Sequence, residues 1–209
     1  MIKLNYQELI KKLDQDIQQS NKNRYFIAIS GPPASGKSTT SEKLHSDLIL
    51  KKHKPSILQM DGFHYDNSIL KEKGLLQKKG APETFDVYGF LNFIKRLQDE
   101  PEVVVPIFDR SLELSRSSAV IIPEESKVII IEGNYLLLNL QPWTDLQNYF
   151  DTSVMIDCEE KILEQRLIDR WKNFNLSNDE INQKVYKNDL PNGLNVLKNS
   201  TLAKYYLTN

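Results

Sequence analysis

The sequence has little cysteine and no long apolar run, and each shortage excludes a class of protein. Its single cysteine, Cys158, has no partner for an internal disulfide and fits a reducing cytoplasm. No apolar run approaches the ~18–20 residues of a membrane-spanning helix. The first five residues, MIKLN, lack the apolar core of a signal peptide. We therefore expect a cytoplasmic protein that does not use a membrane as partner.

Net charge is also nearly absent, which argues against polyanionic partners. The 27 Lys and Arg against 28 Asp and Glu give a net charge of −1 at pH 7. This balance offers no electrostatic case for nucleic acid as main partner. With 209 residues, 40% of them hydrophobic and 26% charged, the chain is expected to form a single globular domain over residues 1–209. The sequence carries no signal of oligomeric state.

The sequence does contain a glycine-rich stretch between a predicted strand and a predicted helix. Residues 31–38, GPPASGKS, fit G-x-x-x-x-G-K-[ST], a loop whose backbone N–H groups wrap nucleotide phosphates. The apolar run 25–29 precedes it, and residues 38–50, free of Gly and Pro, predict a helix whose N-terminus faces the phosphates. The alternative is a turn that merely joins a strand to a helix. The predicted nucleotide-binding residues are Gly31, Pro32, Pro33, Ala34, Ser35, Gly36, Lys37, Ser38 and Thr39.

Strands and helices alternate along the rest of the chain. The strands are apolar throughout, which favours a parallel sheet covered by helices on both faces, as in the α/β class. We expect a mainly parallel five-stranded sheet. Its strands lie at about 25–29, 56–60, 127–131 and 153–157 and in the tail after Leu194, and helices lie at about 6–20 (amphipathic), 38–50, 84–98 and 159–174. A capping box at 177–180 starts another helix. A peripheral hairpin pairs 103–108 with 119–122 around a polar loop at 111–118, and residues 188–193 form a turn cluster.

Polar residues follow three of the expected strands: Ser30, Asp61 and Glu132. Ligands gather at the carboxyl edge of such a sheet. Lys37 would neutralise the β- and γ-phosphates, and Ser38 would ligate Mg²⁺, which prefers oxygen ligands such as Glu132 and Asp61. Asp61 is also the candidate base toward an acceptor hydroxyl. The alternative is that Asp61 and Glu132, each followed by glycine, simply begin turns.

Other polar residues have a functional and a plain structural interpretation. His64 fits a pocket wall better than a catalytic base. Asp109 and Arg110, at the hairpin bend, could form a surface salt bridge of little energetic weight. Arg166 and Arg170 lie four residues apart on one helix face, so they could reach a common anion or belong to a solvated face.

Several short motifs carry a specific resemblance. In order, they are the loop with Ser-Thr after its lysine, DGFH at 61–64, ETFD at 83–86, FDR at 108–110, EGNYLL at 132–137, and Arg166 through Arg170-Trp171. Together they resemble the superfamily of uridine kinase, phosphoribulokinase and bacterial pantothenate kinase, and within it the small bacterial kinases described as fructose-transport-system or pantothenate-kinase-like. The resemblance spans about residues 25 to 195. It implies a P-loop NTPase fold with kinase-type strand order and a kinase that transfers phosphate from ATP, with Mg²⁺, to a small-molecule hydroxyl.

The resemblance also implies roles for individual residues. Asp61 would be the catalytic base, Glu132 would replace a Walker-B aspartate, and Lys37, Arg166 and Arg170 would act on the phosphates, the arginines from a lid at about 164–178. The turn at 188–192 would lie near the adenine. The implied acceptor pocket comprises Asp61, Phe63, His64, Tyr88, Asp109, Arg110 and Tyr135. DGFH departs from the Asp-Ser-Phe-Tyr of uridine kinases, so a sugar, a nucleoside and a pantothenate-like acceptor all stay open.

Two other functions compete with this one. A nucleoside monophosphate kinase shares the scaffold but uses a second nucleotide as acceptor. A nucleotide-binding regulatory protein would bind without turnover. GTPase switches carry N-K-x-D after the loop, whereas the only Asn-Lys pair here, Asn21-Lys22, precedes it.

Overall fold

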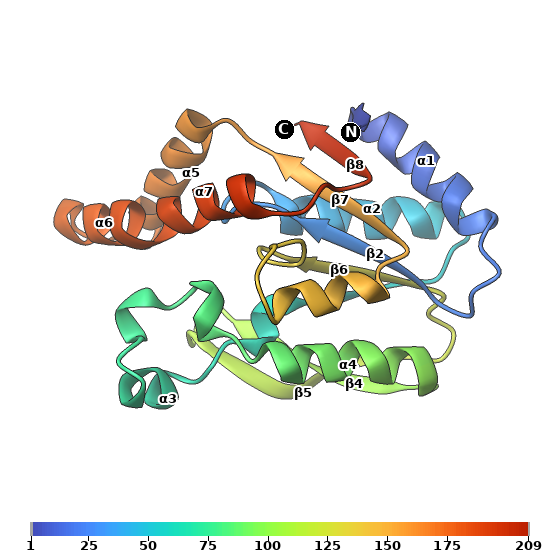
Figure 1. Ribbon diagram of the computed structural model, residues 1–209, viewed down its shortest axis with the longest axis horizontal. Helices are drawn as coiled ribbons and strands as arrows, with labels where there is room; N and C mark the ends of the chain where they lie inside the picture. The colour runs from blue at the N-terminus through green and yellow to red at the C-terminus, as the bar shows by residue number, and fades with distance from the viewer. Residues whose placement is uncertain (1, 209) are drawn as a thin grey trace.

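A six-stranded sheet forms the centre of the computed structural model, which describes residues 2–208 (Figure 1). All neighbouring strands are parallel, in the order β1-β8-β7-β2-β6-β3. The strands are β1 (Ile2–Leu4), β2 (Tyr25–Ser30), β3 (Pro55–Gln59), β6 (Val128–Gly133), β7 (Thr152–Asp157) and β8 (Tyr205–Thr208).

The α/β class and the parallel sheet are confirmed, but the predicted count of five strands was wrong. The additional strand is β1, which pairs with β8 at the edge of the sheet. Its three residues, with Lys3 in the middle, are too few and too exposed to form an apolar run. The pairing partner therefore determines this strand, and its own sequence carries no signal for it.

Side chains of β2 alternate between two apolar cores on opposite faces of the sheet. Ile27 and Ile29 belong to the core that α1 (Tyr6–Gln18) and α2 (Lys37–Leu50) cover. Phe26 and Ala28 face the other core, which contains α4 (Val87–Asp99). All six residues of β2 are buried. Because successive side chains of a strand point to opposite faces, a strand buried on both sides has the unbroken apolar run that the sequence shows.

The remaining helices are grouped around the carboxyl edge of the sheet. They are α3 (Asn67–Glu72), α5 (Glu160–Asn173), α6 (Asn178–Lys184) and α7 (Leu190–Asn199). Helix α6 begins with the predicted capping box, in which Ser177 and Glu180 satisfy each other's backbone N–H groups. A smaller apolar cluster around Leu163 and Leu167 joins α5 to α6. Among residues 2–208, no helix combines the length and the apolarity that a bilayer-spanning segment requires.

The predicted turn cluster at 188–193 was wrong, because this segment is helical. A π-helical turn, Val185–Asp189, continues α6 directly into α7. Pro191 lies in the first turn of α7, where a proline is tolerated because its missing N–H has no essential partner. The polar Asn, Asp, Pro and Gly residues that resembled a turn therefore lie where one continuous helix changes its hydrogen-bond pattern.

The predicted hairpin is confirmed as the antiparallel pair β4 (Val103–Asp109) and β5 (Leu114–Ile122), which lies beside α4 at the bottom of Figure 1. Pro106 falls within the register shift between Val105 and Ile107, where a missing N–H is tolerated. The hairpin turn is shorter than the expected loop at 111–118, because β5 already begins at Leu114.

A buried arginine fixes the end of α4 against the segment that leads into β6. Arg24 is 6% exposed, and its guanidinium donates to five backbone carbonyls and to no carboxylate. Those carbonyls belong to Leu97, Glu100, Pro101, Pro123 and Ser126. The planar fork of an arginine can satisfy several buried acceptors at once.

We predict that Arg24→Met lowers the free energy of unfolding by roughly 2–4 kcal/mol, because it leaves several buried carbonyls without donors. Chemical denaturation of both proteins measures the difference. Arg96→Met is the matched control in the same region: Arg96 is paired with Glu100 across one exposed turn of α4, and its loss should change stability little. Equal effects of the two substitutions would contradict this interpretation of Arg24.

Candidate active site

The glycine-rich loop connects β2 to the N-terminus of α2, as predicted. Gly36, the residue before the helix, has φ 93°, a left-handed conformation that favours glycine. The ammonium of Lys37 donates to the carbonyl of Pro32 at 2.8 Å, which holds the side chain within the loop. Burial lowers the pKa of Lys37 to about 8, against the opposing attraction of Glu132 and Asp61. The loop therefore presents a buried cation and free helix N–H groups, a site for a polyanion.

Glu132 lies beside this loop because β6 pairs in register with β2, residue 132 opposite Ile29. The carboxylate is 4% exposed, and the hydroxyl of Ser38 donates to its Oε1 at 3.2 Å. Burial, with Asp61 nearby, raises the pKa of Glu132 to about 6. The structure therefore brings Ser38 and Glu132, both expected as Mg²⁺ ligands, within hydrogen-bond distance of each other.

Asp61 lies in a 3-10 turn, Met60–Phe63, directly after β3. A guanidinium N–H of Arg110, at the hairpin bend, donates to its Oδ2 at 3.3 Å. The turn and the hairpin approach so closely that a Cβ at Gly62 would lie 2.6 Å from the carbonyl oxygen of Pro106. Close backbone packing therefore brings the hairpin, with Arg110, to the carboxyl edge of the sheet.

Two adjoining cavities meet at Asp61. The P-loop cavity, of about 290 Å³, is lined by Lys37, Ser38 and Glu132 among others. The distal cavity, of about 120 Å³, is lined by His64 and Lys79 among others. The residues that line both are Pro33, Asp61, Arg110, Asn134 and Arg170. The Asp61 carboxylate therefore stands at the junction of the two spaces.

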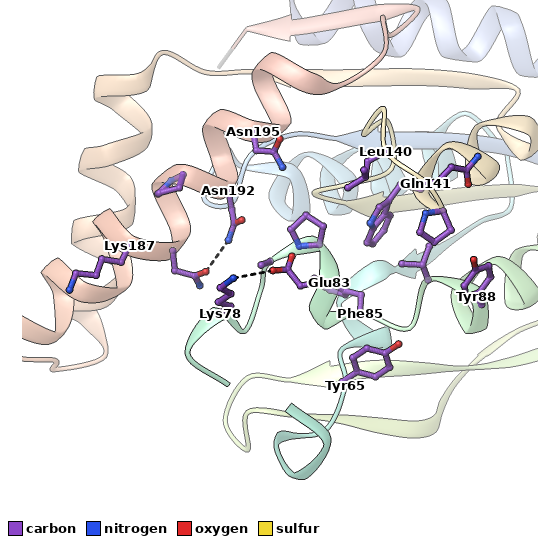
Figure 2. A pocket seen from close by; sticks show the side chains of 17 residues that line it. Tyr65, Lys78, Glu83, Phe85, Tyr88, Leu140, Gln141, Lys187, Asn192 and Asn195 are labelled. Atoms are coloured by element: carbon purple, nitrogen blue, oxygen red, sulfur yellow. Dashed lines mark hydrogen bonds and ion pairs between the residues drawn. The ribbon is translucent and has the colours of Figure 1, made fainter. Parts of the chain in front are cut away.

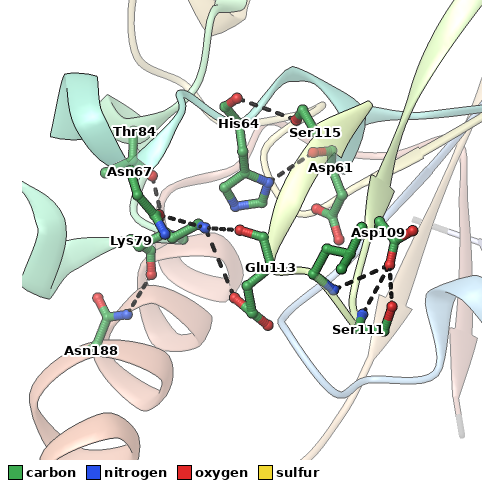
Figure 3. Close-up of polar contacts among 12 residues, drawn as sticks. Asp61, His64, Asn67, Lys79, Thr84, Asp109, Ser111, Glu113, Ser115 and Asn188 are labelled. Carbon is green, nitrogen blue, oxygen red and sulfur yellow. Dashed lines mark hydrogen bonds and ion pairs between the residues drawn. The ribbon is translucent and has the colours of Figure 1, made fainter. Parts of the chain in front are cut away.

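His64 forms part of the distal wall, close to Asp61 in Figure 3. Its ring packs against Phe85 and Phe108, with centroids 4.0 and 4.8 Å away. Its Nδ1 lies 2.8 Å from the backbone carbonyl of Asp61, and since a carbonyl only accepts, Nδ1 carries the proton. Burial lowers the pKa of His64, which favours the neutral ring. The residue is held by packing and supports the Asp61 turn, which agrees with a wall rather than a base.

The two arginines of α5 have different positions. Arg170 lines both cavities, and its guanidinium lies 5.4 Å from the ring centroid of Trp171. Arg166 instead donates to the carbonyl of Ser35 at 3.4 Å and contacts Cys158. Arg170 therefore lines the P-loop cavity, whereas Arg166 does not line it and supports the loop through the Ser35 carbonyl.

Four residues assigned by resemblance to an acceptor pocket lie elsewhere. Phe63 packs in the core on Phe90. Tyr135 is fully buried, and its hydroxyl donates to the carbonyl of Gly80. The Asp109 carboxylate accepts from Ser111 and Arg116 at the hairpin turn. Tyr88 lines a third hollow of about 510 Å³ beside Trp143, shown in Figure 2, which none of Lys37, Asp61 and Glu132 lines.

Sequence reasoning missed several residues of the distal cavity. Those to which it gave no role are Lys79, Glu113, Asn134, Trp171 and Lys184. Lys79 lies in a lysine-rich segment without periodicity, so no local pattern indicated it. Asn188 and Asn192 were noticed as a motif near the adenine, whereas the structure has them in the wall of the distal cavity with Asp61 and His64.

The oxygen groups of the P-loop cavity fit a magnesium ion. Mg²⁺ is usually bound through one or two carboxylates, with waters and substrate phosphates in the other positions. Ser38, Asp61 and Glu132 supply a hydroxyl and two carboxylates within one cavity. Within residues 2–208 there is no cluster of three or more His, Cys, Asp or Glu side chains that could hold a metal by themselves. The donor set therefore suits a largely hydrated ion held jointly with a nucleotide.

Comparison with known proteins agrees with this geometry. The chain is 33% identical over 182 residues to the uncharacterised protein YggC of Escherichia coli K12, covering 86% of this chain and 76% of YggC. It is 29% identical over 157 residues to pantothenate kinase of Ligilactobacillus salivarius, covering 74% of this chain and 51% of that protein. The chain therefore spans about half the length of the pantothenate kinases that it matches.

A solved structure covers almost the whole fold. The crystal structure of a candidate fructose transport system kinase from Silicibacter sp. TM1040 superimposes with a TM-score of 0.93 at 34% identity, covering 97% of this chain and 98% of that one. The sequence pattern of the phosphoribulokinase and uridine kinase family matches residues 26–181, which include the loop, Asp61, Glu132 and Arg170. On these grounds the chain belongs to the phosphoribulokinase/uridine kinase family.

Proposed function

We propose that the protein transfers the γ-phosphoryl group of ATP to a hydroxyl of a small molecule, with Mg²⁺. The observation that carries the proposal is the position of Asp61 at the junction of the P-loop cavity and the distal cavity. A kinase needs its donor and its acceptor to meet in line at one oxygen-rich point. Family membership supports the reaction type.

The donor half of the reaction rests on the loop and the start of α2. Backbone N–H groups of the loop and the dipole of α2 would hold the β- and γ-phosphates. The Lys37 ammonium, which donates to the carbonyl of Pro32, would donate to the phosphates instead. Ser38 and Glu132, with Asp61, would hold Mg²⁺, whose chemistry is to neutralise charge on the bridging phosphate oxygens.

The acceptor half rests on Asp61. A hydroxyl group entering from the distal cavity would meet this carboxylate before it reached the terminal phosphate. Asp61 would orient the hydroxyl and accept its proton as the new O–P bond forms. Arg110 positions the carboxylate through Oδ2, and the Nδ1–H of His64 holds the backbone of the same turn.

The cations at the junction would stabilise the transferring group. Arg170 and Arg110 both line the point where the two cavities meet. Preorganised cations aimed at charge that develops in the transition state are worth most where water is excluded. Arg166 would contribute indirectly, because its hydrogen bond to Ser35 supports the loop.

We predict that Asp61→Asn lowers kcat by about 10²–10⁴-fold, the usual contribution of a positioned general base. KM for ATP should rise less than kcat falls, because the loop, Ser38 and Glu132 still hold the phosphates and the Mg²⁺. Coupled measurement of ADP release across a metabolite panel, which includes nucleoside monophosphates, provides the test. Asp99→Asn, at an exposed carboxylate at the end of α4, is the control. If Asp61→Asn turns over any acceptor as fast as the original protein, Asp61 is not the base.

A second prediction separates the two arginines. Arg170→Met should reduce kcat by about 10²-fold or more, as loss of a transition-state donor does in other enzymes. Arg166→Met should mainly weaken ATP binding, because it acts through the loop carbonyl of Ser35. Steady-state kcat and KM for ATP distinguish the two effects. A larger kcat loss in Arg166→Met than in Arg170→Met would reverse the assignment.

A further inference from the structure

The wall of the distal cavity that lies away from the loop carries its own cations. Lys79 and Lys184 line this cavity but do not line the P-loop cavity. Arg110 and Arg170, in contrast, line both and are accounted for by the phosphates of the donor. Two lysines are thus placed on the acceptor side with no role in binding ATP.

The ammonium of Lys79 makes two hydrogen bonds. It donates to Oδ1 of Asn67 at 2.8 Å and to the backbone carbonyl of Glu113 at 2.6 Å, as Figure 3 shows. An ammonium has three N–H donors. The carboxylate of Glu113, whose side chain is 57% exposed, forms a loose ion pair with Lys79 at 3.9 Å, too long for a hydrogen bond. The Lys79 side chain is 16% exposed, so one donor of a largely buried cation remains available to a ligand.

The wall between Asp61 and Lys79 is continuous. The His64 ring lies against the Asp61 turn and packs on Phe108, and the Lys79 ammonium lies 5.1 Å from the Phe108 ring centroid. A ligand that lies along this wall would have one end at the Asp61 carboxylate and the other at the Lys79 ammonium. Two rings in contact, those of His64 and Phe108 with centroids 4.8 Å apart, lie between the two ends, so a short carbon chain would follow this wall.

Lys184 approaches the same end of the cavity from α6. Its ammonium lies 4.5 Å from the centroid of the Trp171 ring, and Trp171 itself donates to Oδ2 of Asp189 at 2.7 Å. Asp189 is therefore already engaged, and its buried carboxyl has a raised pKa, which weakens it as a counter-ion. Burial lowers the pKa of Lys79 against the attraction of Glu113 and Asp66, and the charge of Lys184 adds a smaller lowering effect.

From this arrangement we infer that the phosphoryl acceptor carries an anionic group, a carboxylate or a phosphate, a short carbon chain away from its reacting hydroxyl, and that Lys79 with Lys184 binds that group. The inference rests on the proposed kinase function. The volume of the distal cavity, about 120 Å³, is small beside the ~300–1,000 Å³ of drug-sized ligand sites. This volume favours a compact acceptor, such as a small hydroxy acid or a sugar phosphate.

The opposing interpretation gives Lys79 a purely structural role. Its bonds to Asn67 and Glu113 join the loop before Gly80 to α3 and to the hairpin, and Asn188 donates to its backbone carbonyl at 2.9 Å. If Lys79 only joins these segments, its loss should affect all acceptors alike and should lower thermal stability. If it binds the acceptor, its loss should affect anionic acceptors alone and should act on KM.

The first experiment compares acceptor classes in the full-length protein with ATP and Mg²⁺. One arm contains hydroxy acids such as glycerate and gluconate, a second contains sugar phosphates such as fructose 6-phosphate, and a third contains neutral fructose, glycerol and uridine. We expect the highest kcat/KM in the first or second arm, at least tenfold above the best neutral compound, and the better arm identifies the anion. A neutral compound as best acceptor overturns the inference and leaves the kinase function standing. No turnover in any arm overturns the proposed function itself.

The second experiment uses the best anionic acceptor with Lys79→Met and Lys184→Met. We expect each variant to raise KM for that acceptor at least tenfold while kcat and KM for ATP stay within twofold. Lys79→Arg, which keeps the charge, should recover part of the loss. The matched control is Lys78→Met: Lys78 is the sequence neighbour, 64% exposed and paired with Glu83 outside the distal cavity. An unchanged KM in Lys79→Met, or an equal loss with neutral acceptors, overturns the inference.

Discussion

The parallel pairing of β6 with both β2 and β3 is the constraint on which the rest of the site depends. In this register Ile29 and Gln59 both lie beside Glu132, so the three strands reach the carboxyl edge of the sheet at the same level. The phosphate loop leaves β2 one residue after Ser30, and Asp61 follows β3 by two residues. Three segments that are far apart in the sequence therefore deliver a cation cradle and two carboxylates to one place.

Burial gives these groups their electrostatic character. It lowers the pKa of Lys37 to about 8 and raises that of Glu132 to about 6, so each charge is held at a cost that its neighbour only partly offsets. Such a site favours ligands that carry charges opposite to those of the buried groups. A polyphosphate suits Lys37, and a divalent cation suits Glu132 with Asp61. The same logic extends to Lys79, a buried cation on the acceptor side.

Features that depend on local sequence were predictable, whereas features that depend on tertiary contacts were not. The loop, its flanking strand and helix, the capping box at Ser177 and the apolar strands were predictable because periodicity or turn chemistry is local. Strand β1 was not, because its pairing with β8 joins the two ends of the chain. The helical conformation before Pro191 was also not predictable, because residue propensities favour a turn in this segment. The wall of the distal cavity, including Lys79 and Asn134, comes from loops whose positions depend on packing against the hairpin and α6. The ordered motifs identified Asp61 and Arg110 as site residues. They also identified Tyr135, which is buried and does not line the site.

The central claim is that Asp61 marks the point at which donor and acceptor meet. A crystal structure of the protein with Mg²⁺ and a non-hydrolysable ATP analogue tests it most directly. We predict that the terminal phosphate lies at the junction lined by Asp61, Arg110 and Arg170, with the metal ion at the Ser38 hydroxyl and open space beyond it toward His64 and Lys79. A terminal phosphate directed away from Asp61, or a nucleotide seated in the hollow beside Trp143, would contradict it.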